Sequence, residues 1–220
     1  ALKPIDLEIK SGEIVALMGR NGAGKSSLIK ALLDVIDYQG KITKRFVKIG
    51  YIPQDANDLL YHQRVAAECA QTDRDNNLPK GSAETLLNEL APNVKATAHP
   101  RDLSEGQRLA LVLAIVLAPK PDLLILDEPT RGLDYESKAL LTKFLNERAA
   151  SGAAVLIATH DVELVAELAT RIIILAEGEL VADGSTMDVL LASPSFAPQV
   201  TKVMSPRKWL TVNDVLKALE

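Results

Sequence analysis

The feature that most constrains this chain is a glycine-rich octapeptide, Gly19-Arg-Asn-Gly-Ala-Gly-Lys-Ser26, which fits the pattern G-x-x-x-x-G-K-[ST]. The apolar run Ile14–Met18 before it has the length of a buried strand, and residues 26–36 after it read as a helix. Glycines let such a turn bend until consecutive backbone N–H groups point inward. A strand, a bent glycine turn and a helix in this order predict a loop that binds phosphate at the edge of a parallel sheet.

The residue types at the end of the octapeptide suit the chemistry of a nucleoside triphosphate. Lys25 is long enough to reach the outer phosphates, and the hydroxyl of Ser26 is suited to a bound Mg²⁺. The following helix adds the positive end of its dipole. We therefore expect a nucleoside triphosphate as the ligand and Mg²⁺ as its ion. The loop residues expected at the nucleotide, besides Lys25 and Ser26, are Gly19, Asn21, Gly22, Ala23, Gly24 and Ser27.

Two carboxylates, Asp127 and Glu128, directly follow the apolar run 123–126. In doubly wound folds ligands bind at the carboxyl ends of the strands, so these side chains are expected at the same edge as the phosphate loop. Apolar strands often end in an acidic residue, so this pattern alone is a weak signal. The phosphate loop upstream makes it an indication of a catalytic site. We expect Asp127 to hold Mg²⁺ and Glu128 to polarise the water that attacks the outer phosphate.

Strand-like and helix-like segments alternate in the second half of the chain, which predicts an α/β fold with a mostly parallel sheet and helices on both faces. Residues 177–179 read as a hairpin turn into a further strand. Near the start, residues 7–10 alternate apolar and polar as a half-buried strand does, and residues 41–52 indicate one or two short strands. The strands expected in the second half are 123–126, 154–159 and 171–175, and the helices are 107–117, 136–149, 161–169 and 212–219.

The character of the sequence changes between Gln54 and about Asp102, where β-branched runs disappear. Helix-compatible pieces at residues 63–69 and 82–90 are separated by the polar stretch 73–77. This change indicates a small helical insertion in the α/β core.

Four further motifs carry a resemblance to a known family. Leu103-Ser-Glu-Gly-Gln107 resembles the LSGGQ signature of ATP-binding-cassette (ABC) ATPases, and Gln54, in Tyr-Ile-Pro-Gln, is similar to their Q-loop. Gly132-Leu-Asp134 resembles their D-loop, and His160 stands where they have a switch histidine. A histidine satisfied within the core is the alternative interpretation of His160. Together with the phosphate loop and the acidic strand end, six elements in the family's order cover residues 19–160.

This resemblance implies a P-loop NTPase with a RecA-like, mostly parallel sheet, a small antiparallel β part and an inserted helical subdomain. It implies an ATP-binding core of residues 1–53 and 105–220, and a helical subdomain of residues 54–104 that ends at the signature. It also implies that two such domains pack head to tail, with ATP between the phosphate loop of one and the signature of the other. The residues it assigns are Gln54 for catalysis and metal binding, His160 for catalysis beside Lys25 and Glu128, and Ser104, Gly106, Gln107 and Asp134 at the nucleotide.

The signature agrees with this implication in one respect and departs from the family in another. Ser104 followed by Gln107 has the form of a helix capping box, whose N-terminal N–H groups suit a γ-phosphate. Glu105 stands where the family often has glycine. Because a carboxylate facing a triphosphate would be costly, we expect Glu105 to point outward.

The start of the chain lacks one family feature. ABC ATPases usually stack the adenine on an aromatic residue upstream of the phosphate loop, but none of the eighteen residues before Gly19 is aromatic. With Ala1 as the first residue, this favours a domain cut from a longer chain, such as the second half of a tandem ATPase.

Composition narrows the classes of partner. Hydrophobic residues make up 47% and charged residues 25%, as in a well-packed chain, and the formal net charge of -4 argues against nucleic acid as a partner on a broad basic face. The longest apolar run, residues 109–118, is about half of what a bilayer crossing needs, so no transmembrane helix is expected. The single cysteine, Cys69, excludes an internal disulfide and is expected to serve packing.

The resemblance therefore implies the ATP-hydrolysing subunit or domain of an ABC transporter. A second ABC domain and a membrane-spanning subunit are the expected partners, and the cytoplasmic face of the cell membrane is the expected location. Residues 55–60 and 195–200 and the start of the signature helix resemble ATPases of energy-coupling-factor importers. Two alternatives stay open, a soluble ABC ATPase acting on nucleic acid or the ribosome and a degenerate regulatory cassette. The second is disfavoured because Lys25, Asp127, Glu128 and His160 are all present.

Overall fold

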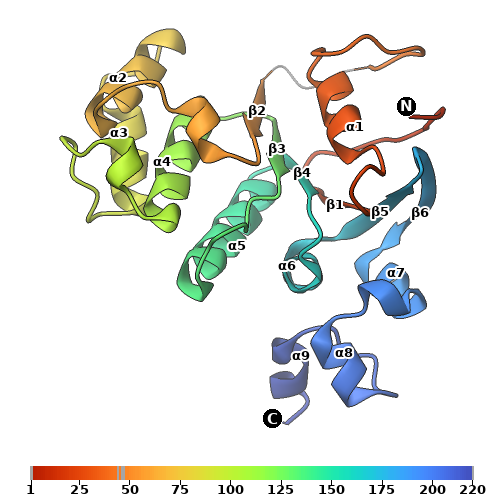
Figure 1. The fold of residues 1–220 in the computed structure, drawn as a ribbon. Helices are drawn as coiled ribbons and strands as arrows, with labels where there is room; N and C mark the ends of the chain where they lie inside the picture. Colours follow the sequence, from red (N-terminus) through yellow and green to blue (C-terminus); the bar gives the residue numbers. More distant parts are fainter. Residues whose placement is uncertain (1, 44, 46–47, 220) are drawn as a thin grey trace. The chain divides into compact units, whose positions relative to one another are not determined.

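The computed structural model describes residues 2–43, 45 and 48–219 (Figure 1). The chain divides into two compact units, one of residues 1–43 and 142–220 and the other of residues 44–141. Among the described residues, no helix combines the length and the apolar character that a bilayer crossing requires.

Strand β1 (Ile14–Met18) is the centre of the sheet in the first unit. It pairs in parallel with β4 (Ala154–Ala158) on one side and with β5 (Arg171–Ala176) on the other. β6 (Glu179–Ser185) pairs antiparallel with β5 after a turn at residues 177–178, whose φ values are 52° and 81°. Positive φ at both central residues gives a turn whose twist matches antiparallel strands. All residues of β1 and β4 are buried, as in strands covered on both faces.

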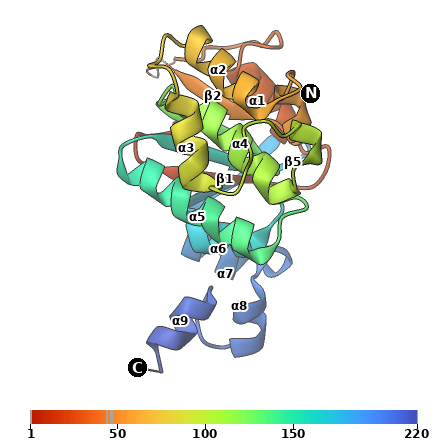
Figure 2. The same cartoon turned by 90° about the vertical axis from the view of Figure 1, so that its left-hand side faces the viewer.

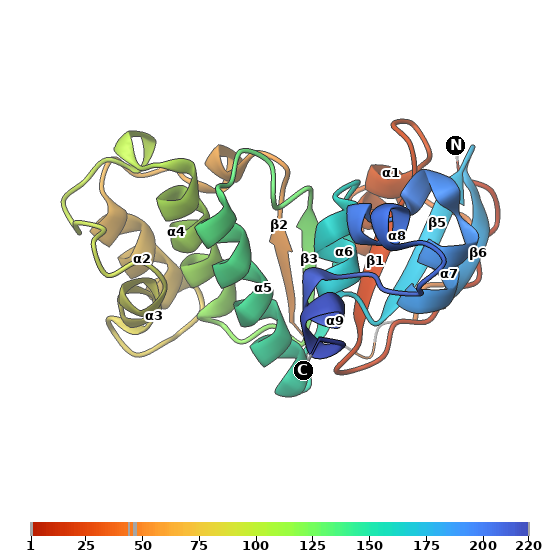
Figure 3. The same cartoon turned by 90° about the horizontal axis from the view of Figure 1, so that it is seen from below.

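Helices cover this sheet. On one face, a cluster of buried side chains joins β1 and β5 to α6 (Val162–Leu168) and α7 (Thr186–Ala192). α7 contacts α6 and lies along β5 and β6 (Figure 3). Leu190 of α7 is fully buried in this cluster, and burial of a leucine side chain contributes about 2 kcal/mol. The unit also contains α1 (Lys25–Leu32), the 3-10 turn η3 (Pro194–Phe196), α8 (Gln199–Met204), α9 (Val212–Lys217) and the second half of α5 (Tyr135–Ala150).

Two parallel strands, β2 (Ile49–Ile52) and β3 (Leu123–Asp127), lie side by side in the second unit. Helix α4 (Glu105–Leu117) packs against β2. The two elements meet closely at Gly50, where a Cβ atom would lie 2.8 Å from Val116 Cγ1. A glycine within this strand therefore lets the helix come nearer than another residue would permit.

The helices of the second unit pack on one another. α4 contacts both α2 (Val65–Asp75) and α3 (Ser82–Leu90), and α2 contacts α3 (Figure 2). The 3-10 turn η1 (Ala56–Leu59) lies between β2 and α2, and a second one, η2 (Pro100–Asp102), leads toward α4. The signature helix α4 is thus held by its neighbours along much of its length.

Asp73 joins α2 to α3. Its carboxylate accepts hydrogen bonds from the backbone N–H groups of Gly81 at 2.6 Å and Ala83 at 3.0 Å, at the start of α3. The residue is buried, and these bonds satisfy its charge at the positive end of the helix. One turn earlier, Cys69 is also buried, which confirms the expectation that it serves packing.

The α/β fold with a mostly parallel sheet and an antiparallel part is confirmed, and the helix expected at residues 82–90 coincides with α3. The expected strand at residues 7–10 is wrong: all four residues are described and none belongs to a strand, although their exposure alternates. Of the region 41–52, only residues 49–52 form a strand among those described, and residues 44, 46 and 47 lie outside them. The proposed helical subdomain of residues 54–104 stays a prediction.

The largest differences from the expected helix boundaries are at the ends of α1 and α2. α1 ends at Leu32 rather than at residue 36, because Asp34 adopts φ of 57°, a left-handed conformation that ends a helix. α2 continues to Asp75, through the polar stretch that was expected to separate two helices. The carboxylate of Asp73 accepts hydrogen bonds from backbone N–H groups at the start of α3, which stabilises this part of α2. Helices α7 and α8 were not expected.

Candidate functional site

The phosphate loop, residues 19–26, leaves β1 and leads into α1. Gly19, Gly22 and Gly24 have φ of 148°, 82° and 108°, in the region that favours glycine. Gly19 also lies against β5, where a Cβ atom would overlap the carbonyl oxygen of Leu175. The bent glycine turn expected from the sequence is present, and its first position accommodates glycine only.

Gly19→Ala is expected to lower the free energy of unfolding by about 2–4 kcal/mol, because the methyl group meets a backbone oxygen at an unfavourable φ. Gly22→Ala is the matched control. Its φ is also positive, but no described atom lies within 4 Å of an added Cβ, so we expect a loss of about 1 kcal/mol. Urea unfolding measures both values, and equal losses would contradict the close approach of Gly19 to β5.

Lys25 is the first residue of α1, and its side chain folds back across the loop. Its ammonium donates a hydrogen bond to the carbonyl oxygen of Gly19 at 2.7 Å, and the carbonyl oxygen of Arg20 lies at 3.4 Å. The residue before the helix is Gly24, which has no side chain to cap the N–H groups of the first turn. A helix N-terminus of this kind is suited to an anion.

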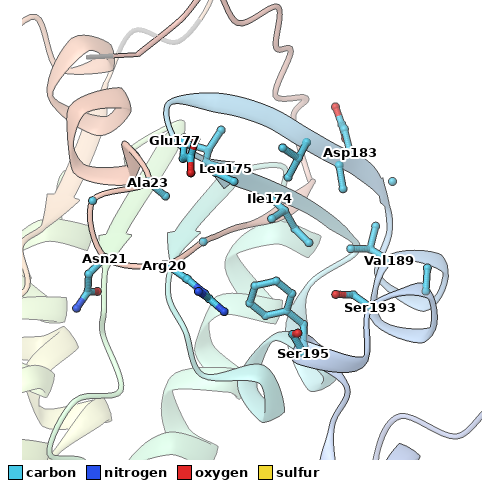
Figure 4. A pocket seen from close by; sticks show the side chains of 18 of the residues that line it. Arg20, Asn21, Ala23, Ile174, Leu175, Glu177, Asp183, Val189, Ser193 and Ser195 are labelled. Atoms are coloured by element: carbon cyan, nitrogen blue, oxygen red, sulfur yellow. The ribbon is translucent and has the colours of Figure 1, made fainter.

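An open hollow of about 1180 Å³ is lined on one side by residues 19–23, the first part of the phosphate loop (Figure 4). Arg20 extends toward it, whereas Asn21 turns away. Residues of β5, β6 and α7, among them Ile174 and Val189, complete its lining. No sequence motif predicts this hollow, because its lining comes from separate elements. Of the other expected loop residues, Asn21, Gly22 and Ser26 are exposed, Gly24 and Ser27 are partly exposed, and Ala23 is buried.

His160 leaves the sheet next to the phosphate loop. Leu17 of β1 is paired with Ala158 of β4, so the two segments start from neighbouring carboxyl ends of parallel strands. His160 is exposed, which argues against a histidine satisfied within the core. The buried Thr159 before it accepts a hydrogen bond from the N–H of Asp161 at 3.0 Å, and Asp161 caps α6. The histidine thus lies between a fixed strand end and a fixed helix start.

The end of β3 is acidic, as expected. Asp127 is its last residue and is buried, and Glu128 follows with a partly exposed side chain. Glu128 has φ of 49°, a left-handed conformation that is uncommon for a residue with a side chain. On β2, the pKa of Tyr51 is raised, first by burial and next by the negative charge of Asp127.

Gln54 lies two residues beyond β2, whose last residue, Ile52, is opposite Leu126 of β3. Gln54 and Glu128 line the same cavity of about 350 Å³ within the second unit. The first turn of α4, with Glu105, lines this cavity as well. The fold therefore brings the Q-loop, the acidic strand end and the signature together, although they are far apart in the sequence.

The signature residues form the capping box expected at the start of α4. Ser104 Oγ accepts a hydrogen bond from the N–H of Gln107 at 3.2 Å, and Gln107 Oε1 accepts one from the N–H of Ser104 at 3.1 Å. Gly106 lies against Ser137 of α5, so closely that a Cβ atom would overlap Ser137 Oγ. A Cβ atom at this position would require Ser137 Oγ to turn away, and Ser137 Cβ would still lie only 3.2 Å from it.

Asp134 precedes α5 and acts there as a capping residue. Its Oδ1 accepts a hydrogen bond from the N–H of Ser137 at 2.8 Å, and hydrogen bonds with Ser137 hold the pKa of Asp134 below its usual value. Glu105 pairs with Arg108 of the same helix at 2.9 Å between Oε1 and Nη1. Its expected direction away from a triphosphate stays a prediction, because it concerns a second domain.

Sequence patterns missed three contributors to this region. Ser137 acts through a contact between two segments, Arg108 through hydrogen bonds to the turn before its own helix, and the left-handed conformation of Glu128 is a backbone property. The one available signal was the glycine at position 106, which indicates a close approach without naming the neighbour.

Comparisons with known proteins agree with the motifs. The family model described as ABC transporter matches residues 2–131. A putative ABC transporter ATP-binding protein of Streptomyces coelicolor is 53% identical over 100% of this chain, and the match covers 41% of that protein. The energy-coupling factor transporter ATP-binding protein EcfA of Methanothermobacter thermautotrophicus is 32% identical over 86% of this chain and 67% of its own length.

Among solved structures, cbiO1 from Clostridium perfringens, described as part of the ABC transporter complex cbiONQ, matches with a TM-score of 0.76 at 26% identity. This match covers 99% of the chain and 92% of that protein. The chain spans 41% of the length of the two Streptomyces relatives that it matches.

Proposed function

Because the chain belongs to the ABC transporter family of ATP-binding domains, we propose that it binds ATP with Mg²⁺ and hydrolyses it to drive a membrane transporter. ATP binding closes two such domains on each other, and hydrolysis lets them separate. The observation that carries this proposal is the phosphate loop. Its three left-handed glycines lead into a helix that begins at Lys25 and has no capping side chain.

The residues proposed to hold Mg²⁺ are Ser26, Gln54 and Asp127. A hydroxyl, an amide oxygen and a carboxylate are the hard oxygen donors that this ion prefers, so the donor set fits. Asp127 fits further because its buried position at the end of β3 keeps its carboxylate in one place. When bound, the ion supplies neutralisation of charge on the outer phosphates.

The protein side chains do the remaining work by position and charge. The ammonium of Lys25, now on the carbonyl oxygen of Gly19, exchanges that partner for oxygens of the outer phosphates. Glu128 accepts a hydrogen bond from the attacking water and orients it in line with the scissile bond. Gln54 and His160 contact the water and the γ-phosphate, while Asp134 supports the nucleotide from the D-loop. The signature of the second domain, Ser104 with Gly106 and Gln107, caps the γ-phosphate.

The transporter is proposed to be an importer of the energy-coupling-factor type. The likeness to EcfA and to cbiO1 supports this, as do the stretches 55–60 and 195–200. The segment after Gln54, which includes η1, is the proposed contact with the membrane-spanning subunit. This contact places the domain at the cytoplasmic face of the cell membrane, and a second ABC domain completes the assembly.

Phosphate release by the intact polypeptide is expected to require both ATP and Mg²⁺. Removal of Mg²⁺ with EDTA should reduce turnover by about a hundredfold or more, because charge on the phosphates is then left without its counter-ion. Addition of excess Mg²⁺ should restore it, which controls for damage by the chelator. A polypeptide without affinity for Mg·ATP in a direct titration, or without any turnover, contradicts the proposed function.

A further inference from the structure

Arg108 is a nearly buried cation next to the signature. It lies in the first turns of α4, immediately after Gln107, and 12% of its side chain is exposed. Charged side chains are seldom buried to this extent unless they are paired. The partners of Arg108 therefore indicate what the fold uses it for.

These partners belong to the turn that leads into α4 and to the first residue of the helix. Nη2 donates to the carbonyl oxygen of Leu103 at 2.9 Å and lies 3.4 Å from that of Arg101, and Nε lies 3.5 Å from that of Pro100. Nη1 donates to Glu105 Oε1 at 2.9 Å. A guanidinium is a rigid planar fork, so several acceptors held at once fix the turn in one conformation. Ser104 stands in the middle of this turn.

The same turn fits closely against the segment after β3. Gly106 meets Ser137 without room for a Cβ atom, and Glu105 Cγ would lie 3.6 Å from a Cβ on Gly132. The contact at Gly106 leaves little space for a shift of the turn toward α5, whereas Glu105 and Gly132 are at an ordinary distance. Loss of the Arg108 hydrogen bonds would release the turn on its inner side, while the contact between Gly106 and Ser137 stays in place.

We propose that Arg108 is a positioning residue for the signature. It fixes the turn that carries Ser104, so that the capping-box hydroxyl and the first N–H groups of α4 meet a γ-phosphate in one geometry. Glu105, which stands where the family often has glycine, is the counter-ion that holds the guanidinium from its exposed side. The inference rests on the proposed function, because the positioned groups act on ATP bound by a second ABC domain.

Arg108→Ala in the intact polypeptide tests this role. Turnover at saturating Mg·ATP should fall by about tenfold or more, because a small misplacement of a transition-state contact is costly. Arg108→Lys retains the charge but offers a point donor in place of a fork, so its turnover should fall by about threefold. The affinity of the chain's own phosphate loop for a fluorescent ATP analogue should stay within about twofold, with an unchanged number of sites, since Arg108 does not serve that loop.

Arg74→Ala is the matched control. Its guanidinium is exposed on α2 of the same unit and donates to Gln71 at 2.6 Å, so its loss should leave turnover unchanged. Unchanged turnover in Arg108→Ala would overturn the inference. A parallel loss of ATP-binding sites and turnover would overturn it too, because it would show a role in folding only. Absence of turnover in the unmodified polypeptide would overturn the proposed function together with this inference. A failure of the inference alone is different, because the unmodified polypeptide then hydrolyses ATP.

Discussion

Glu128→Gln is expected to reduce ATP turnover by about a hundredfold or more while ATP binding persists. The amide has the size of the carboxylate but neither its charge nor its basicity, so it orients a water molecule without activating it. Glutamine and glutamate have a similar conformational cost at φ of 49°, so the substitution changes the chemistry of the side chain and leaves the backbone conformation as it is. Single-turnover phosphate release and binding of a fluorescent ATP analogue measure the two quantities separately.

The same variant should accumulate an ATP-bound dimer, visible in size-exclusion chromatography, because hydrolysis is the step that separates the two domains in the proposed function. Glu147→Gln is the matched control, since Glu147 is exposed on α5. Its turnover should equal that of the unmodified chain. If Glu128→Gln turned over ATP at the normal rate, the role assigned to Glu128 would be wrong.

Lys25→Ala is expected to weaken ATP binding by about thirtyfold or more. Lys25 supplies charge-assisted hydrogen bonds in a nearly buried position, and the loss of about 2 kcal/mol or more corresponds to that factor. Isothermal titration of Mg·ATP measures the affinity directly, without dependence on turnover.

Lys30→Ala controls for the loss of a positive charge on the same helix, because Lys30 is exposed in the last turn of α1. Its affinity for Mg·ATP should remain normal. Normal affinity in Lys25→Ala itself would contradict the phosphate loop as the ATP site. Together with Glu128→Gln, this variant separates binding from chemistry.

The parts of the site that were predictable lie in consecutive residues. The phosphate loop could be read because its bend needs glycine at fixed positions, and those residues show the expected left-handed φ. The capping box of Ser104 and Gln107 was predictable for the same reason, as both partners lie within one helical turn. The acidic end of β3 followed from an apolar strand followed by two carboxylates.

The parts that were not predictable depend on contacts between different structural elements, including elements that are close in the sequence. Alternation at residues 7–10 describes exposure correctly, but a strand also needs a partner for its N–H and C=O groups, and no periodicity names that partner. The polar stretch around Asp73 resembles a break until the N-terminus of α3 is available to bind the carboxylate. The hydrogen bonds from Arg108 to the carbonyl oxygens before α4 likewise form only in the folded turn.

The buried thiol on α2 has a practical consequence for studies of motion. Burial, aided by the nearby carboxylates of Glu84, Asp73 and Glu68, raises the pKa of Cys69 to about 12. A thiol that stays protonated reacts slowly with maleimides and methanethiosulfonates. Since the chain has one cysteine, a second one introduced on the surface would react first in the otherwise natural sequence. Fluorescent or spin labels attached in this way would report the proposed opening and closing of the two domains in real time.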